Sequence, residues 1–307
     1  MSTSLDSLFL RMTPHLSQLE DERAKLKKRG TQQALIALLA ALGVGIVLSF
    51  AVQHVAALPV CLVVGGIVGL ILIQSKSTPL SLFYKQHIVA PMLESLVPGA
   101  TYQPESGIPE SLFRECQLFD TAPDRYHSED LMQGKIDKTA FSLAEVHAEK
   151  RVVTVDSKGR TSEHWQDIFK GFLFVADFNK NFSGQTLLHR DTWIKLPRKG
   201  SRIKLEDPRF EKYYDVYGTD PVEARYILTP SLMERIVEMN TKFDKPTLSF
   251  INSNVVVAIA TLNDYFETSI WKPANRKEKF LSDFGMLIAM LDVVRDLNLN
   301  NRIWSKE

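Results

Sequence analysis

Two long apolar runs lie near the start of the chain. The first covers residues 33–52 and the second residues 57–74, and residues 33–75 contain no Lys, Arg, Asp or Glu. At about 1.5 Å per helical residue, each run is long enough for the roughly 30 Å hydrocarbon core of a bilayer. Only four residues separate the runs. The pattern therefore predicts a transmembrane helical hairpin over residues 33–75.

Small residues recur every fourth position within both runs. They are Ala37, Ala41, Gly45 and Ser49 in the first run, and Ala57, Cys61, Gly65 and Gly69 in the second. Residues four apart lie on one face of a helix, and small side chains let two helix backbones approach closely. The spacing predicts close membrane packing. It leaves open whether the two stripes meet each other or a second copy of the chain.

The segments on either side of the hairpin have helical patterns. In residues 1–32, the Thr13-Pro14 pair is typical of a helix start, with Thr as the cap and Pro in the first turn. This helical segment is expected to bind a partner, to self-associate, or to rest on lipid or on the main domain. Residues 76–99 predict a stalk helix, which Pro91 can kink and Pro98-Gly99 ends.

Beyond residue 100, strand and helix patterns alternate. Strands are predicted over residues 141–155, over the doubly apolar and therefore central run 169–178, and in a hairpin over 247–261 that turns at Asn252-Ser253-Asn254; a strand end is expected at Ile227-Leu228. Helices are predicted over residues 108–119, 229–243 with Thr229 as the cap, and 277–299. The expected fold of residues 100–307 is an independently folding α+β domain, with a mainly antiparallel sheet and flanking helices.

Charge indicates the orientation of the hairpin and excludes one class of function. The chain has 37 Lys and Arg against 36 Asp and Glu, so no basic surplus suggests a nucleic-acid partner. Lys25, Lys27, Lys28 and Arg29 precede the first run, and Lys76 and Lys85 follow the second. Lys and Arg concentrate in cytoplasmic flanks. Both termini are therefore predicted to be cytoplasmic.

Few residues suggest chemistry. Glu145, His147 and Glu149 alternate on a predicted strand and form a metal-type set, although the solvent-facing side of a half-buried strand is the simpler interpretation. Two fragments of an acid/base site are His127, Glu129 and Asp130 in an expected loop, and His189 with Asp191 just after a strand. No phosphate-binding glycine loop or nucleophile motif occurs, so no cofactor is predicted. Cys61 and Cys116 indicate neither a disulfide nor a metal site.

Four segments, residues 134–150, 169–188, 210–236 and 248–260, resemble a bacterial membrane family. It is the domain-of-unknown-function family numbered three-one-three-seven, and the block Asp220 to Ile236 is the most specific part of the resemblance. The resemblance implies a multi-pass protein of the bacterial inner membrane, with two spans followed by a cytoplasmic α+β domain. Because the family has no established activity, it implies no catalytic residue.

Together these observations favour a non-enzymatic function. The chain is predicted to be a membrane-anchored interaction or ligand-binding module on the cytoplasmic face. Its expected partners are the lipid bilayer and either a protein or a second copy, bound through the hairpin or the N-terminal helix. The alternative is a membrane-tethered enzyme with a site built from scattered His and acidic residues. Convergence of His127, His147 and His189 in one cleft would favour the enzyme.

Overall fold

A computed structural model describes residues 5–53, 56–155, 159–178, 180–190, 200–244 and 246–299. The chain divides into two compact units. The first unit combines Met1–Met92 with Asp264–Met286, and the second combines Leu93–Asn263 with Leu287–Glu307. A C-terminal segment, 264–286, is therefore grouped with the apolar hairpin, although sequence analysis places it in the domain 100–307.

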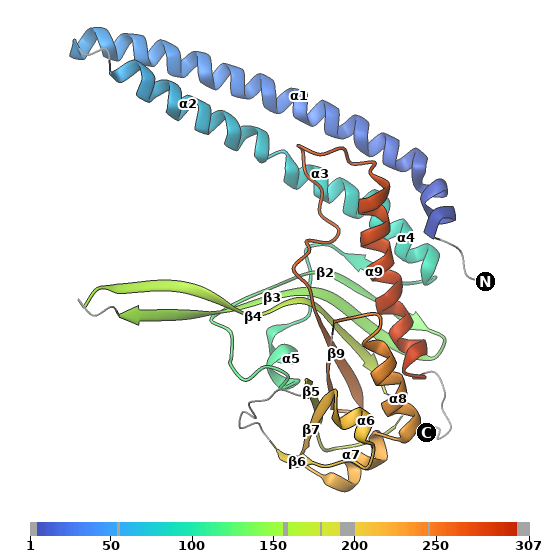
Figure 1. Cartoon of the computed structure of the whole chain (residues 1–307). Coiled ribbons are helices and arrows are strands. Elements are labelled where there is room, and N and C mark those ends of the chain that lie inside the picture. Colours follow the sequence, from blue (N-terminus) through green and yellow to red (C-terminus); the bar gives the residue numbers. More distant parts are fainter. Residues whose placement is uncertain are drawn as a thin grey trace. The chain divides into compact units, whose positions relative to one another are not determined.

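The first unit is built on two long helices, α1 (Leu5–Val52) and α2 (Ala57–Gln74), which run antiparallel beside each other (Figure 1). The predicted pair of apolar helices is thus confirmed, and both are long and apolar enough to cross a membrane. After α2 follow α3 (Ser77–Tyr84), a π-helical turn η1 (Lys85–Val89) and α4 (Ala90–Leu96). The π turn ends two residues before Pro91, whose missing N–H favours a wider turn at this point.

Helix α1 does not begin at Thr13-Pro14, so that prediction is wrong. The helix passes through Pro14, and Thr13 Oγ1 donates to the Phe9 carbonyl at 2.9 Å instead of capping a helix start. The buried residues Leu8, Met12, Leu16 and Leu19 form one continuous stripe across the expected boundary. Packing of this stripe within the first unit outweighs the single backbone hydrogen bond that proline removes.

The second unit contains a nine-stranded sheet of order β1-β2-β3-β4-β9-β8-β5-β7-β6, in which every neighbouring pair is antiparallel. The predicted antiparallel sheet is confirmed. The strands are β1 (Thr101–Gln103), β2 (Arg125–Ile136), β3 (Thr139–Val155), β4 (Thr161–Asp177), β5 (Thr186–Arg190), β6 (Ser201–Ile203), β7 (Tyr214–Gly218), β8 (Thr247–Ile251) and β9 (Asn254–Ala260).

Helices α5 (Glu110–Glu115), α6 (Pro208–Glu211), α7 (Pro221–Ile227) and α8 (Pro230–Met239) belong to the second unit, and α9 (Lys277–Asp296) begins in the first unit and ends in the second. Thr229 caps α8 as predicted, because its hydroxyl accepts from the Leu232 N–H. The strand end expected at Ile227-Leu228 is wrong: this segment ends helix α7, which Asp220 caps and Pro221 starts.

The core of the second unit follows strand alternation. Phe113 of α5 packs with Val146 of β3 and Leu173 of β4 on one face of the sheet. Phe172 and Phe174 of β4 point to the other face and are 1% and 0% exposed, which confirms the prediction of a central buried strand. The predicted hairpin turn at Asn252-Ser253 is also confirmed, since both residues have positive φ angles, 51° and 58°, as a tight two-residue turn requires.

Candidate functional site

A row of polar side chains covers part of one face of strands β2, β3 and β4, next to the buried Phe172 that lies opposite Glu145. Three cross-strand pairs place Arg125 opposite Glu149, His127 opposite His147, and Glu129 opposite Glu145. Directly opposite residues point to the same face of a sheet. The register of β4 adds Asp167 opposite Glu149 and Trp165 opposite Arg151. We call this surface the β2–β4 polar face; it comprises Arg125, His127, Glu129, Glu145, His147, Glu149, Arg151, Trp165 and Asp167.

The expected loop at His127, Glu129 and Asp130 is instead part of strand β2, so that prediction is wrong. A β-bulge between Glu129 and Met132 disturbs the alternation that identifies a strand. Asp130 has a φ of 60° and is buried, and it accepts a hydrogen bond from the Tyr102 hydroxyl. Asp130 therefore holds β1 against β2 and is not part of the polar face.

A second bulge, where Ala148 and Glu149 pair with β4, brings Asp167 to the centre of the polar face. His147 Nε2 lies 2.8 Å from Asp167 Oδ1, and Arg125 Nη1 lies 3.2 Å from Glu149 Oε2. The possible ligand atoms of His147, Glu149 and Asp167 all lie within 4.8 Å of one another. The structure thus joins two residues of the predicted metal-type set with Asp167, which sequence analysis missed, while Glu145 lies outside this group.

The charges of the polar face are largely engaged with one another. Glu149, with its side chain only 14% exposed, is paired with Arg125, and the Arg125 guanidinium also stacks 3.9 Å from the centre of the Trp165 ring. Arg151 and Glu163 form a further pair at 3.6 Å. A cation bound at Glu149 would have to compete with Arg125. The arrangement is therefore better suited to recognition by arginine and tryptophan than to metal coordination.

His189 does not join the other two histidines. It lies within β5, not after a strand as expected, and it is 5% exposed with its ring 6.3 Å from that of Tyr217. In the sheet order, β5 is four strand steps from β3, or about 19 Å at about 4.8 Å per step. Its predicted companion Asp191 lies outside the described residues. His127 and His147 are therefore neighbours on adjacent strands, and His189 is separate from both.

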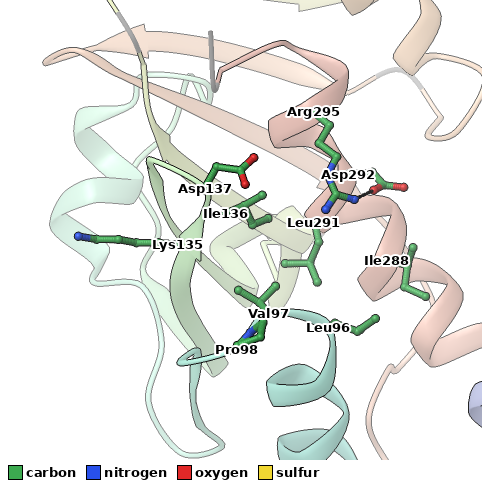
Figure 2. Close-up of a pocket in the computed structure, with 10 residues that line it drawn as sticks. All are labelled: Leu96, Val97, Pro98, Lys135, Ile136, Asp137, Ile288, Leu291, Asp292 and Arg295. Atoms are coloured by element: carbon green, nitrogen blue, oxygen red, sulfur yellow. Dashed lines mark hydrogen bonds and ion pairs between the residues drawn. The ribbon is translucent and has the colours of Figure 1, made fainter. Parts of the chain in front are cut away.

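A small cavity lies elsewhere in the second unit, between the residues after α4, the β2–β3 turn and the end of α9 (Figure 2). Its volume is about 200 Å³. The lining combines apolar residues such as Ile136 and Leu291 with Lys135, Asp137 and a pair formed by Asp292 and Arg295 at 3.4 Å. Sites for small molecules usually have about 300–1,000 Å³. The volume gives no support to a cofactor site here.

The predicted small-residue stripes face each other between α1 and α2. A β-carbon placed on Gly45 would lie 3.1 Å from Cys61 Cβ, and one on Gly65 would lie 2.5 Å from Ala41 Cβ and 3.5 Å from the Ala37 carbonyl oxygen. At Gly69 the corresponding distance to Ala34 Cβ is 3.1 Å. Ser49 and Ala57 are half-buried at the far end of the pair. Within one chain, the two stripes are thus in close contact with each other.

A protein-family model matches part of the chain. Residues 167–299 match the family model described as "Protein of unknown function (DUF3137)". The match confirms the resemblance over this region, which contains the block from Asp220 to Ile236. No curated protein and no solved structure matches the chain.

Proposed function

We propose that this protein is a membrane-anchored binding module of the bacterial inner membrane. In this proposal the α1–α2 hairpin spans the bilayer and both termini are cytoplasmic. The second unit then binds a protein partner through the β2–β4 polar face.

The main support for a membrane anchor is the exposed apolar surface of α1 and α2. Phe50, Val47 and Ile36 are 83%, 67% and 66% exposed, and no charged residue occurs in residues 33–75. In water, large contiguous apolar surfaces are rare on monomeric proteins, whereas hydrocarbon solvates them well. Helices also satisfy their backbone hydrogen bonds internally, which a membrane span requires.

The orientation can be tested by cysteine labelling in intact bacteria. The full-length protein carries Cys61→Ala together with either Gln53→Cys, in the expected outer loop, or Ser106→Cys. Native Cys116 adds little background because burial raises the pKa of its thiol to about 11. A membrane-impermeant maleimide should label residue 53 and label residue 106 only after lysis. Labelling of residue 106 in intact cells, or of neither residue before lysis, would contradict the proposed topology.

The polar face is favoured as the protein-binding surface because it combines Arg125 with an exposed tryptophan. Trp165 is 42% exposed and lies at the base of a two-stranded arm, where β3 and β4 continue past β2 and pair only with each other (Figure 1). Trp and Arg are enriched among residues that dominate protein interfaces. Their stacking also fixes the guanidinium, which reduces the entropy lost on binding.

A matched pair of variants tests this surface. The exposed Tyr226 stacks with Lys180 at 4.4 Å elsewhere in the second unit and is 44% exposed, so Tyr226→Ala removes an equivalent aromatic–cation contact. Full-length protein is captured from solubilised membranes, and the bound proteins are quantified by mass spectrometry. A partner should be lost with Trp165→Ala and retained with Tyr226→Ala. If both variants keep the same partners, binding does not use the polar face.

A second candidate function is a membrane-tethered enzyme, favoured by the group His147, Glu149 and Asp167. Histidine and carboxylates are suitable ligands for divalent metals such as zinc or manganese. Calorimetric titration of the full-length protein with Zn²⁺ and Mn²⁺ tests it. Saturable binding that His147→Ala removes and His127→Ala preserves would favour the enzyme. Equal binding by all three proteins would remove this candidate.

A further inference from the structure

A tryptophan from the C-terminal part of the chain is attached to the end of the apolar hairpin. The Trp271 indole N–H donates to Gln74 Oε1 at 2.8 Å, and Gln74 is the last residue of α2. The ammonium group of Lys27, on α1, lies 5.9 Å from the centre of the Trp271 ring. All these residues belong to the first unit.

Contacts between α1 and α2 show how far along the hairpin Trp271 lies. A β-carbon on Gly30 of α1 would lie 3.2 Å from the Ile73 Cα of α2 and 3.4 Å from Lys76 Cγ. Residues 30 and 73 therefore lie side by side. At this level the apolar surface ends, because charged residues resume at Arg29 on α1 and Lys76 on α2. Trp271 lies at the boundary between the apolar surface of the hairpin and the charged surface that adjoins it.

The loop that carries Trp271 is held firmly against α1. Ile270 is fully buried, and its carbonyl accepts from Arg23 Nη1 at 2.8 Å. The Ala274 N–H donates to Glu20 Oε2 at 2.8 Å, and Arg23 in turn is paired with Glu20. Between these anchored residues, Trp271 remains 45% exposed. The loop therefore presents the indole outward at a fixed height.

Basic residues lie close to this level of the hairpin on both helices and next to Trp271 in the sequence. Lys28, Arg29 and Lys272 are exposed and Lys27 and Lys76 are partly exposed. Within the described residues, Lys28, Arg29 and Lys76 form no ion pair, whereas Lys25, further along α1, is paired with Glu22. An indole at an apolar boundary with lysines beside it suits the headgroup region of a bilayer, where tryptophan is enriched and lysine attracts anionic lipids.

We infer that Trp271, with Lys27 and Lys76, forms an interfacial anchor that binds the headgroups of anionic phospholipids at the cytoplasmic end of the hairpin. This inference rests on the proposed membrane insertion. It assigns to the segment 264–276, which is distant in sequence from the spans, a direct role at the bilayer surface. The indole occupies the interface and the two ammonium groups contact lipid phosphate.

Depth-dependent fluorescence quenching tests the position of Trp271. The full-length protein, with Trp165, Trp193 and Trp304 replaced by Phe, is reconstituted into phosphatidylcholine vesicles brominated either near the headgroup or deep in the acyl chain. Trp271 should be quenched more strongly by the shallow bromines. A companion protein with Trp271→Phe and Val44→Trp reports on the middle of the span and should be quenched more strongly by the deep ones.

The two probes separate the possible failures. If the residue 44 probe is quenched and Trp271 is not, the interfacial anchor is wrong and the span stands. If the residue 44 probe is not quenched, the proposed membrane insertion itself is wrong and the anchor falls with it.

Lipid selectivity tests the lysines. In mixed vesicles, bromine is placed only on phosphatidylglycerol or only on phosphatidylcholine, at equal mole fraction. Trp271 should be quenched more by the brominated anionic lipid. The association constant of the anionic lipid relative to phosphatidylcholine should fall by about five-fold for each of the substitutions Lys27→Gln and Lys76→Gln. The charge-matched control Lys135→Gln and Lys138→Gln, in the second unit, should leave it unchanged. Equal quenching by both lipids in the unmodified background, or equal losses in the two variant pairs, would overturn the inference.

Discussion

Replacing Gly65 with leucine should weaken the α1–α2 pair, whereas the same replacement at the adjacent Gly66 should not. A β-carbon on Gly65 would lie 2.5 Å from Ala41 Cβ, but one on Gly66 would meet nothing within 4 Å. The two variants add the same side chain to neighbouring positions of one helix. They differ only in the direction in which it points, toward α1 or away from it.

The expected difference follows from the contact distance. Non-bonded carbons prefer about 3.5–4.0 Å, so the helices must separate by about 1 Å even for the first added carbon at Gly65. Overpacking of this kind typically costs about 1–3 kcal/mol. Both variants gain about 1 kcal/mol of helix propensity, which cancels in the comparison. Gly65→Leu should therefore be less stable than Gly66→Leu by about 1–3 kcal/mol, or roughly 5- to 150-fold in the unfolding equilibrium.

The measurement is reversible unfolding of the full-length protein in mixed micelles with increasing dodecyl sulfate. Energy transfer between dyes on Lys28→Cys and Ser75→Cys, which lie at the same end of the two helices, reports on their separation; Cys61→Ala and Cys116→Ala remove the native thiols. Gly45→Leu should behave like Gly65→Leu, because its β-carbon would lie 3.2 Å from the Leu58 backbone, and exposed Val44→Leu should behave like the parent. Coincident unfolding curves for Gly65→Leu and Gly66→Leu would refute close packing at this face.

Three further predictions concern the rest of the chain. Leu232→Ala should lower the free energy of unfolding by about 2–5 kcal/mol in denaturant titration because Leu232 is only 6% exposed, whereas Arg225→Ala, at an exposed side chain, should cost much less; equal losses would place the α7–α8 junction outside the core. Burial raises the pKa of Asp283 above its ordinary 3.8, against the opposing effects of Lys279 and Tyr84, so its folded state retains a proton that the unfolded state loses. The free energy of unfolding should thus fall as pH rises from about 4 through the raised pKa. The control is Asp283→Asn, melted in parallel at each pH. A stability difference between the two proteins that does not change with pH would contradict this prediction. The sequence alone predicts that residues 100–307 fold independently, but contacts within the first unit favour the opposite. A truncation to residues 100–307 leaves Phe280 without the Phe9 ring and Asp283 without the Tyr84 hydroxyl, so it should lose cooperative melting in calorimetry. A sharp native-like transition would show that residues 264–286 fold without residues 1–92.

The sequence predicts helices and strands correctly where a single local signal, such as an apolar run or a capping residue, determines the structure. The apolar runs, the strand with two apolar faces at 169–178 and the Thr229 cap each follow from local rules, and the structure confirms them. Errors occurred where tertiary packing or a bulge changed the local rule. Pro14 lies inside a helix because a buried stripe continues past it, and Asp130 interrupts the alternation of β2 without ending the strand.

The candidate site was only half visible in the sequence for a related reason. Alternation places His147 and Glu149 on one strand face, but it cannot reveal which residue of β4 lies opposite. The bulge at Ala148 and Glu149 shifts the register by one residue and thereby brings Asp167 to the polar face. Arg125, which pairs with Glu149, precedes the predicted histidine fragment by two residues and has no distinguishing local signal.

Helix α1 combines two chemical patterns in one uninterrupted element. Up to about Gly30 it has a single buried stripe and charged residues on its other sides, and from Leu35 to Val52 its exposed residues are all apolar. The first half contacts residues 264–286 through Phe9, Glu20 and Arg23, and the second half packs against α2 at Ala41 and Gly45. Because no loop separates the halves, the boundary between the charged and the apolar surface of α1 is set by its side chains alone. Trp271 is attached at that point, so in the proposed membrane orientation the same contacts that complete the first unit also place the indole at the bilayer surface.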